Sequence, residues 1–231
     1  IALYVALGVL VAFLTVVIVR TLSFKPKKAV EPDRTEIAFD REKTVANLQA
    51  LVKFKTVSYR NHSLEDDGEF EGLVSKLPEL YPNEFAKCEF MRFEDRALLL
   101  KWKGKGEGDA SVMMAHYDVV PVNEDLWDVP AFDAIVKDGC IWGRGTLDTK
   151  VTFSSILFAA DHLISEGFTP ENDIYFAFGG DEEVNGHGAK DIVKLFIERK
   201  INPGLVLDEG GAVVENVFPG VKVPCGLIGI A

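Results

Sequence analysis

The first nineteen residues, Ile1 to Val19, contain no charged side chain, and Arg20 and three lysines follow them. As a helix this stretch spans roughly 28 Å, close to the thickness of the hydrocarbon core of a bilayer. We therefore predict a signal anchor or signal sequence over residues 1–24, with membrane contact through Ile1 to Val19. A cleaved signal peptide is the alternative, but the apolar run exceeds a usual h-region and no A-x-A site follows it.

Residues 25–39 are charged and contain two prolines, which predicts a linker. We expect the folded domain to occupy residues 40–231. The chain begins at Ile rather than Met and stops within "CGLIGIA", an apolar run that resembles an unfinished strand. We therefore expect a sequence truncated at both ends, whose residues 40–231 form the N-terminal part of a larger domain.

Within this domain the hydrophobic pattern alternates between helical and strand-like periods. Apolar positions recur at helical spacing over residues 45–54, 70–80, 149–166 and 186–200. Short apolar runs predict strands at 88–94, 97–104, 111–118, 140–148, 173–180 and 204–211. This order implies right-handed crossovers, so the predicted fold is α/β, with a mostly parallel central sheet and helices on both faces.

Composition narrows the function classes. The 231 residues are 48% hydrophobic, which is ample for a core, and the formal charge is −11 because 36 acids outnumber 25 bases. A protein that binds phosphates needs clustered Lys and Arg, so we expect no nucleic-acid partner. The three cysteines show no CxxC pair, which argues against a thiolate metal site and leaves any disulfide undecided.

Acids and one histidine follow four of the predicted strands, each near glycine. These residues are His116, Asp118, Asp148, Asp181, Glu182, Glu183, Asp208 and Glu209. Singly, such a residue is more often a turn, a cap or part of a solvated loop. Together they would meet outside the C-terminal ends of the strands, where open sheets bind ligands. Because so many carboxylates at one edge require cations, the sequence predicts a metal pair.

The spacing within two of these groups suggests separate roles. Residues two apart on extended chain face the same side, so Asp118 can orient the ring of His116. Glu182 and Glu183 are adjacent and would point to different sides. One of them can bind metal while the other moves protons.

Four ordered motifs carry a family resemblance: "MMAHYDVVP", "WDVPAFDAIVKDGCIWGRGTLDTK", "GGDEEVNGHGAKDI" and "LVLDEGG". Together they resemble the two-zinc peptidases that include carboxypeptidase S, aminoacylase and the secreted N-acyl amino acid hydrolases. The resemblance covers Asp40 to Ala231 and looks closest to the branch of carboxypeptidase S and the N-fatty-acyl-amino acid hydrolases. It implies the zinc exopeptidase-like catalytic domain, with a lid domain inserted beyond Ala231.

The resemblance also implies roles for individual residues. Two Zn²⁺ ions are bridged by Asp148; His116 and Asp208 hold one, and Glu183 holds the other. Asp118 orients His116, and Glu182 is the general base. The peptide bond Asp148–Thr149 is expected to be cis. The last zinc ligand, a histidine, and the lid domain that would form a homodimer are expected beyond Ala231, and no other cofactor is implied.

The predicted function is hydrolysis of amide bonds next to a free carboxylate, in C-terminal peptide bonds or N-acyl amino acids. The alternatives are a catalytically incomplete anchored fragment or binding protein of this fold and, more weakly, an aminopeptidase or deacetylase. The catalytic domain is expected to be lumenal, vacuolar or extracellular and membrane-anchored, or secreted. One sequon, Asn61-His62-Ser63, agrees with this.

Three further histidines and one arginine have side chains that could serve in a site. We interpret His187 as a helix-start or surface histidine, His62 as a loop residue and His162 as part of a helix. Arg144 lies between two glycines, where it either meets substrate or, as we favour, pairs with a nearby acid.

Overall fold

The computed structural model describes residues 2–24 and 36–226, so most of the predicted linker lies outside the described residues. The chain divides into two compact units, Ile1–Ala38 and Phe39–Ala231. The first unit contains helix α1, Ala2–Ser23. Its 22 residues are long and apolar enough to cross a membrane by length and composition alone, a test that a signal sequence also passes. Membrane anchoring therefore stays a prediction.

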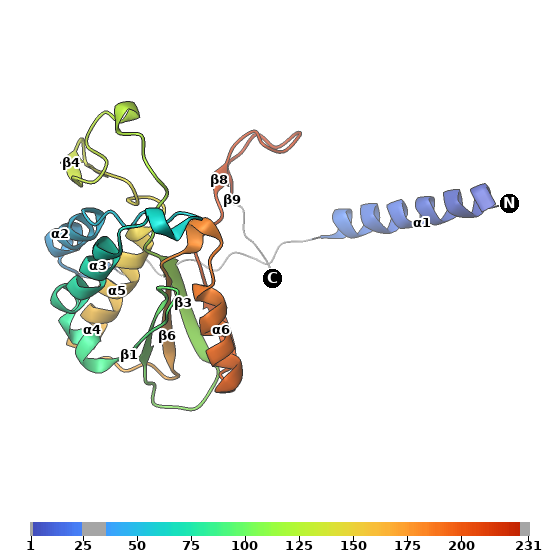
Figure 1. Ribbon diagram of the computed structural model, residues 1–231. Coiled ribbons are helices and arrows are strands. Elements are labelled where there is room, and N and C mark those ends of the chain that lie inside the picture. Colours follow the sequence, from blue (N-terminus) through green and yellow to red (C-terminus); the bar gives the residue numbers. More distant parts are fainter. Residues whose placement is uncertain (1, 25–35, 227–231) are drawn as a thin grey trace. The chain divides into compact units, whose positions relative to one another are not determined.

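The second unit contains the helices and strands that the hydrophobic pattern predicts (Figure 1). Its helices are α2 (Arg41–Val52), α3 (Asp67–Leu80), α4 (Pro82–Lys87), α5 (Lys150–Ser165) and α6 (Gly188–Glu198), with 3-10 turns η1 (His62–Leu64), η2 (Glu124–Leu126) and η3 (Glu182–Val184). Sequence reasoning missed α4, because a proline followed by five residues is too short to show a helical period.

Within residues 36–226 the central sheet has five strands, in the order β1-β2-β6-β3-β7. They are β1 (Glu89–Arg92), β2 (Leu98–Trp102), β6 (Ile174–Gly179), β3 (Ala110–His116) and β7 (Pro203–Leu207). β3 is parallel to β6 and β7, whereas β2 is antiparallel to both β1 and β6. The α/β class is confirmed, but the sheet is mixed rather than mostly parallel. Residues 93–97, which join β1 to β2, are too few for the crossover that a parallel pair needs.

Helices cover both faces of this sheet (Figure 1). On one face, Ile192 and Phe196 of α6 belong to a buried cluster with Leu99 of β2. On the other face, α2, α3, α4 and α5 pack around a larger cluster that includes Leu98 and Leu100 of β2. Successive residues of β2 therefore enter opposite cores, as the two-residue period of a strand requires.

The predicted strand at 140–148 lies outside the central sheet. Cys140–Trp142 form β5, which in the described part of the chain pairs only with β4, Ile135–Lys137, in a separate antiparallel hairpin. A second small hairpin joins β8 (Val213–Val214) to β9 (Cys225–Gly226). Asp148 consequently comes from the segment that connects β5 to α5, and not from the end of a central strand. All three cysteines are free thiols.

Candidate metal centre

The candidate centre lies at the edge of the sheet where β3, β6 and β7 end. In the register of the parallel pair, His116 of β3 stands opposite Gly179, the last residue of β6. After β6 the chain passes through Gly180 into the acids 181–183, and β7 leads directly into Asp208 and Glu209. Parallel strand direction thus brings two acidic segments and the histidine to one edge.

Three carboxylates lie around the Nε2 atom of His116. Its Nε2 atom lies 3.0 Å from Asp148 Oδ1, 3.1 Å from Glu209 Oε1 and 3.8 Å from Glu182 Oε2. The His116 side chain is only 2% exposed, whereas that of Asp148 is 65% exposed. One buried imidazole nitrogen therefore faces acids from three separate chain segments.

The donor atoms fall into two groups that suit a metal ion. His116, Asp148 and Glu183 form one group and His116, Glu182 and Glu209 the other, each with its ligand atoms within 4.8 Å of one another. Imidazole nitrogen with carboxylate oxygens is a donor set that zinc accepts. The residues present therefore fit zinc, although both groups depend on the same imidazole.

Asp118 joins the histidine to the acidic turn. Its Oδ1 atom lies 3.3 Å from His116 Nδ1 and accepts a hydrogen bond from Glu182 N at 3.2 Å. Its Oδ2 atom accepts from Glu183 N at 3.1 Å and from the Ser58 hydroxyl at 2.6 Å. The ring nitrogen Nδ1 is also 3.0 Å from the Asp118 carbonyl oxygen. These acceptors hold a proton on Nδ1, so that Nε2 is the nitrogen that can exchange its own proton for a cation.

Asp181 performs a different task from its two acidic neighbours. Its Oδ2 atom accepts hydrogen bonds from the backbone N–H of His187 at 2.6 Å and of Gly188 at 3.0 Å. A Cβ atom on Gly186 would come within 1.8 Å of the same oxygen, so only glycine permits this turn. Asp181 therefore shapes the turn that leads into α6.

The charges of the centre perturb its pKa values. Burial opposes the charged form of His116, but Asp118 and Glu209 outweigh it and raise the pKa to about 10. Burial, together with neighbouring carboxylates, raises the pKa of Glu182 and of Glu183 above the usual value. The surplus of negative charge is the electrostatic condition under which a divalent cation binds.

Asp208 and Glu209 occupy places that the sequence does not distinguish. Both line a pocket of about 390 Å³ together with His116 and Glu182. The Asp208 carboxylate accepts a hydrogen bond from the backbone N–H of Glu209 at 2.8 Å, while Glu209 reaches the imidazole. The role of Asp208 as a ligand stays a prediction, and Glu209 is the strand-end acid that the structure brings to His116.

Comparison with known proteins identifies the family. Residues 112–222 match the peptidase family M20/M25/M40. The N-fatty-acyl-amino acid synthase/hydrolase PM20D1.1 of Danio rerio is 34% identical over 97% of this chain and 46% of its own length. The probable carboxypeptidase S-like 2 of Dictyostelium discoideum is 34% identical over 96% of the chain and 46% of its own length. The chain belongs to peptidase family M20/M25/M40.

Two solved structures share the fold. Human carnosine dipeptidase 1 superposes with a TM-score of 0.63 at 15% identity, over 75% of this chain and 40% of that chain. The M20 family metallo-carboxypeptidase Sso-CP2 of Sulfolobus solfataricus gives 0.60 at 20% identity, over 77% and 39%. At these identities the likeness concerns the fold. The chain spans about half the length of the curated relatives it matches.

The segment that carries Asp148 has the backbone form that the M20 resemblance implies. The peptide bond Asp148–Thr149 is cis, as predicted. The next residue, Lys150, is fully buried, and its Nζ atom donates to the carbonyl oxygens of Leu51 at 3.0 Å and Phe54 at 2.7 Å. Lys150 thereby ties the start of α5 to the end of α2.

The remaining histidines lie as interpreted. His187 is exposed immediately before α6, His62 is exposed in η1, and His162 lies within α5, stacked on Phe158. For Arg144 we favoured a pairing with a nearby acid, and among the described residues this was wrong. Its guanidinium lies over the ring of Trp127, 5.4 Å from the centroid, and the ion pairs found among residues 36–226 do not include it.

Sequence reasoning placed Glu209 among the strand-end acids without a role, and it missed Ser58. Glu209 carried the same signal as Asp208, because both are acids directly after β7, and periodicity does not choose between neighbours. Ser58 carried no signal, since a serine in "FKTVSYR" resembles any loop serine. Its contact with Asp118 joins residues 60 positions apart and exists only in the folded chain.

Proposed function

We propose that the chain belongs to a di-zinc hydrolase that cleaves amide bonds next to a free carboxylate, in C-terminal peptide bonds or N-acyl amino acids. One observation carries the proposal: the buried His116 faces carboxylates from three chain segments at the edge of the sheet. The names of the relatives, an N-fatty-acyl-amino acid synthase/hydrolase and a probable carboxypeptidase, supply the substrate class.

The ligand roles follow the M20 resemblance. His116 and Asp208 would hold one zinc ion, Glu183 the other, and Asp148 both. The exposed carboxylate of Asp148 and the buried ring of His116 already lie in contact, which supports a shared ion between them. When bound, the zinc ions would polarise the scissile carbonyl and lower the pKa of a water molecule.

Glu182 would act as the general base. Its side chain is 59% exposed, and its Oε2 atom lies 3.8 Å from His116 Nε2, so it can reach a water molecule and the substrate at the centre. It would accept a proton from the attacking water and return it to the leaving amine. Asp118 would keep the proton on His116 Nδ1, and its bonds to the backbone of Glu182 and Glu183 would fix both acids relative to that ring.

A second candidate is a protein that binds a single metal ion without catalysis. It is favoured by one observation, that both donor groups among the described residues use His116. One imidazole nitrogen does not serve two ions. The zinc content of the full-length protein, which would include the histidine expected beyond Ala231, separates the candidates, because the hydrolase requires two ions per chain and the binding protein one.

We further propose that the catalytic domain lies outside the cytosol, anchored by α1 or secreted. The length and apolar composition of α1 and the exposed sequon at Asn61 support this localisation.

The decisive experiment compares Glu182→Gln with Glu198→Gln in the purified protein. Glu198 ends α6 and is an exposed acid outside the centre, which makes it a matched control. We expect Glu182→Gln to retain zinc and to lose hydrolysis of an N-acyl amino acid by about 10²–10⁴-fold, and Glu198→Gln to retain activity. Full activity of Glu182→Gln would exclude Glu182 as the base. Hydrolysis of the N-acyl amino acid amide as fast as of the free acid would exclude carboxylate recognition.

A further inference from the structure

We propose that Ser58 is a positioning residue of the metal centre, which acts by holding the carboxylate of Asp118. Through Asp118 it would fix the ring of His116 and the backbone of Glu182 and Glu183. The inference rests on the proposed function, because it names a residue that supports the same centre. Ser58 belongs to none of the four motifs that carry the family resemblance.

Both oxygens of the Asp118 carboxylate have their hydrogen-bond partners within the protein. Asp118 is completely buried, so water does not compensate for a lost donor. Each carboxylate oxygen has two partners: Oδ1 faces Glu182 N and His116 Nδ1, and Oδ2 faces Glu183 N and the Ser58 hydroxyl. The Ser58 bond is the shortest of these contacts, at 2.6 Å. Its removal would leave Oδ2 with one donor and hold the carboxylate less firmly.

Ser58 itself is also held in place. Its side chain is almost fully buried, and its backbone N–H donates to the Val119 carbonyl at 3.1 Å. The next N–H, of Tyr59, donates to Glu65 Oε1 at 2.8 Å. Glu65 in turn accepts from Arg96 at 2.6 Å, with only 1% of its side chain exposed. Ser58 therefore presents its hydroxyl from a fixed backbone.

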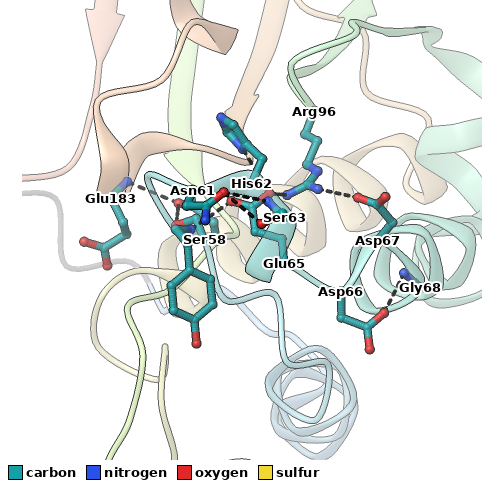
Figure 2. A network of polar contacts seen from close by, with 12 residues as sticks. Ser58, Asn61, His62, Ser63, Glu65, Asp66, Asp67, Gly68, Arg96 and Glu183 are labelled. Atoms are coloured by element: carbon teal, nitrogen blue, oxygen red, sulfur yellow. Dashed lines mark hydrogen bonds and ion pairs between the residues drawn. The ribbon is translucent and has the colours of Figure 1, made fainter.

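Figure 2 shows these contacts as one row that leads from Glu183 past Ser58 to Glu65, Arg96 and Asp67. The row joins the acidic turn after β6 to the segment between α2 and α3. A hydroxyl is the smallest side-chain group that can donate to Asp118 from this position. Alanine would keep the backbone contacts and remove only the bond to the carboxylate.

The chain offers a matched control two residues away. Thr56 is also fully buried, and its hydroxyl donates over the same distance, 2.6 Å, to the Tyr117 carbonyl. Thr56 accepts from Val119 N through its backbone, so it belongs to the same pairing of segments. Among the described residues, no hydrogen bond joins Thr56 to Asp118. Thr56→Val and Ser58→Ala therefore remove comparable buried hydrogen bonds, and only the second touches the centre.

The test measures zinc affinity of the purified protein by competition with a chromogenic chelator, together with kcat and KM for an N-acyl amino acid. We expect Ser58→Ala to weaken zinc binding by about 10-fold and to lower kcat by a similar factor with KM unchanged. Thr56→Val should change each quantity less than about 2-fold, even if both variants lower the melting temperature equally. Equal effects of the two variants would overturn the inference and reduce Ser58 to a structural residue.

Asp118→Asn distinguishes this failure from failure of the proposed function. If Asp118→Asn weakens zinc binding while Ser58→Ala matches Thr56→Val, only the inference about Ser58 is wrong. If Asp118→Asn leaves zinc binding unchanged, the proposed centre itself is wrong. Should Ser58→Ala fail to fold, Ser58→Cys replaces it under the same criterion, because a thiol keeps most of the volume and is a weak donor.

Discussion

The backbone N–H of Glu84 donates to Asp161 Oδ1 over 3.2 Å, whereas the carboxyl group of Glu84 has no hydrogen-bond partner among the described residues. Asp161 also accepts from Asn83 N at 2.7 Å, so it caps the first turn of α4. Glu84 is fully buried beside it. Burial, and to a lesser extent the charge of Asp161, raises the pKa of Glu84 well above its usual value.

This arrangement predicts a pH-dependent stability. Because the folded protein holds the Glu84 proton more tightly than the unfolded chain does, the stabilising contribution is complete below about pH 4.5 and is lost as pH rises. Glu84→Gln cannot ionise, so we expect its melting temperature relative to that of the wild type to be higher at pH 8 than at pH 4.5. The gain in free energy of unfolding should reach at most about 1.4 kcal/mol per pH unit.

Thermal unfolding of both proteins across that range measures the difference directly. Glu79→Gln is the control, since the Glu79 side chain is 69% exposed and its ion-pair partner among the described residues is Lys76 on the same helix. A difference between Glu84→Gln and wild type that does not change with pH would contradict the buried, protonated carboxyl.

Glu65 predicts the opposite pH dependence. Burial opposes its charge, but hydrogen bonds from Tyr59 N and His62 and the charge of Arg96 outweigh burial and hold its pKa below the usual value. Its stabilisation is therefore present above pH 4.5 and is lost as pH falls through the lowered pKa. We expect Glu65→Gln to cost about 1–3 kcal/mol of unfolding free energy at pH 7.

The cost of Glu65→Gln should shrink when denaturant unfolding is repeated near pH 3. Asp67→Asn tests the second acid that pairs with the guanidinium of Arg96. The Asp67 side chain is 86% exposed, so this change should cost under about 1 kcal/mol. Equal costs for the two variants would mean that the buried contact of Arg96 with Glu65 stabilises the fold no more than its exposed contact with Asp67.

The choice between Asp208 and Glu209 as the zinc ligand is open to direct measurement. The family resemblance implies Asp208, and we expect Asp208→Asn to weaken zinc binding by about 10–100-fold with Glu209→Gln nearly silent. Zinc competition on the two variants checks this. The reverse ranking would assign the ligand to Glu209, which already lies 3.1 Å from His116 Nε2.

The sequon predicts N-glycosylation of Asn61 if the catalytic domain lies outside the cytosol. Asn61 is exposed, and its Oδ1 atom accepts from Ser63 N at 3.2 Å and from Ser63 Oγ at 2.9 Å. After expression in a eukaryotic secretory pathway, glycosidase treatment should increase gel mobility in the wild type and in Ser63→Thr. Asn61→Gln should abolish the shift. A wild-type protein without a glycan would contradict the proposed localisation of this site.

Much of the architecture followed from local pattern. Periods in the apolar pattern predict the positions of the central strands and of helices α2, α3, α5 and α6. Residues on one face of a helix recur about every 3.6 positions, and residues on one face of a strand recur every second position. The pairing of strands did not follow from this pattern. A loop of five residues made β1 and β2 antiparallel, and the hairpin of β4 and β5 stands apart from the central sheet. Hydrophobicity carries no information on strand direction.

The sequence by itself determined which residue types stand after each strand, and hence that acids would meet His116. Only the tertiary structure decided which of them do so, because neighbours such as Asp208 and Glu209 share one pattern and differ in direction. It alone placed Ser58 against Asp118, across 60 positions of chain. Such contacts depend on how separate elements pack, and local periodicity does not encode that packing.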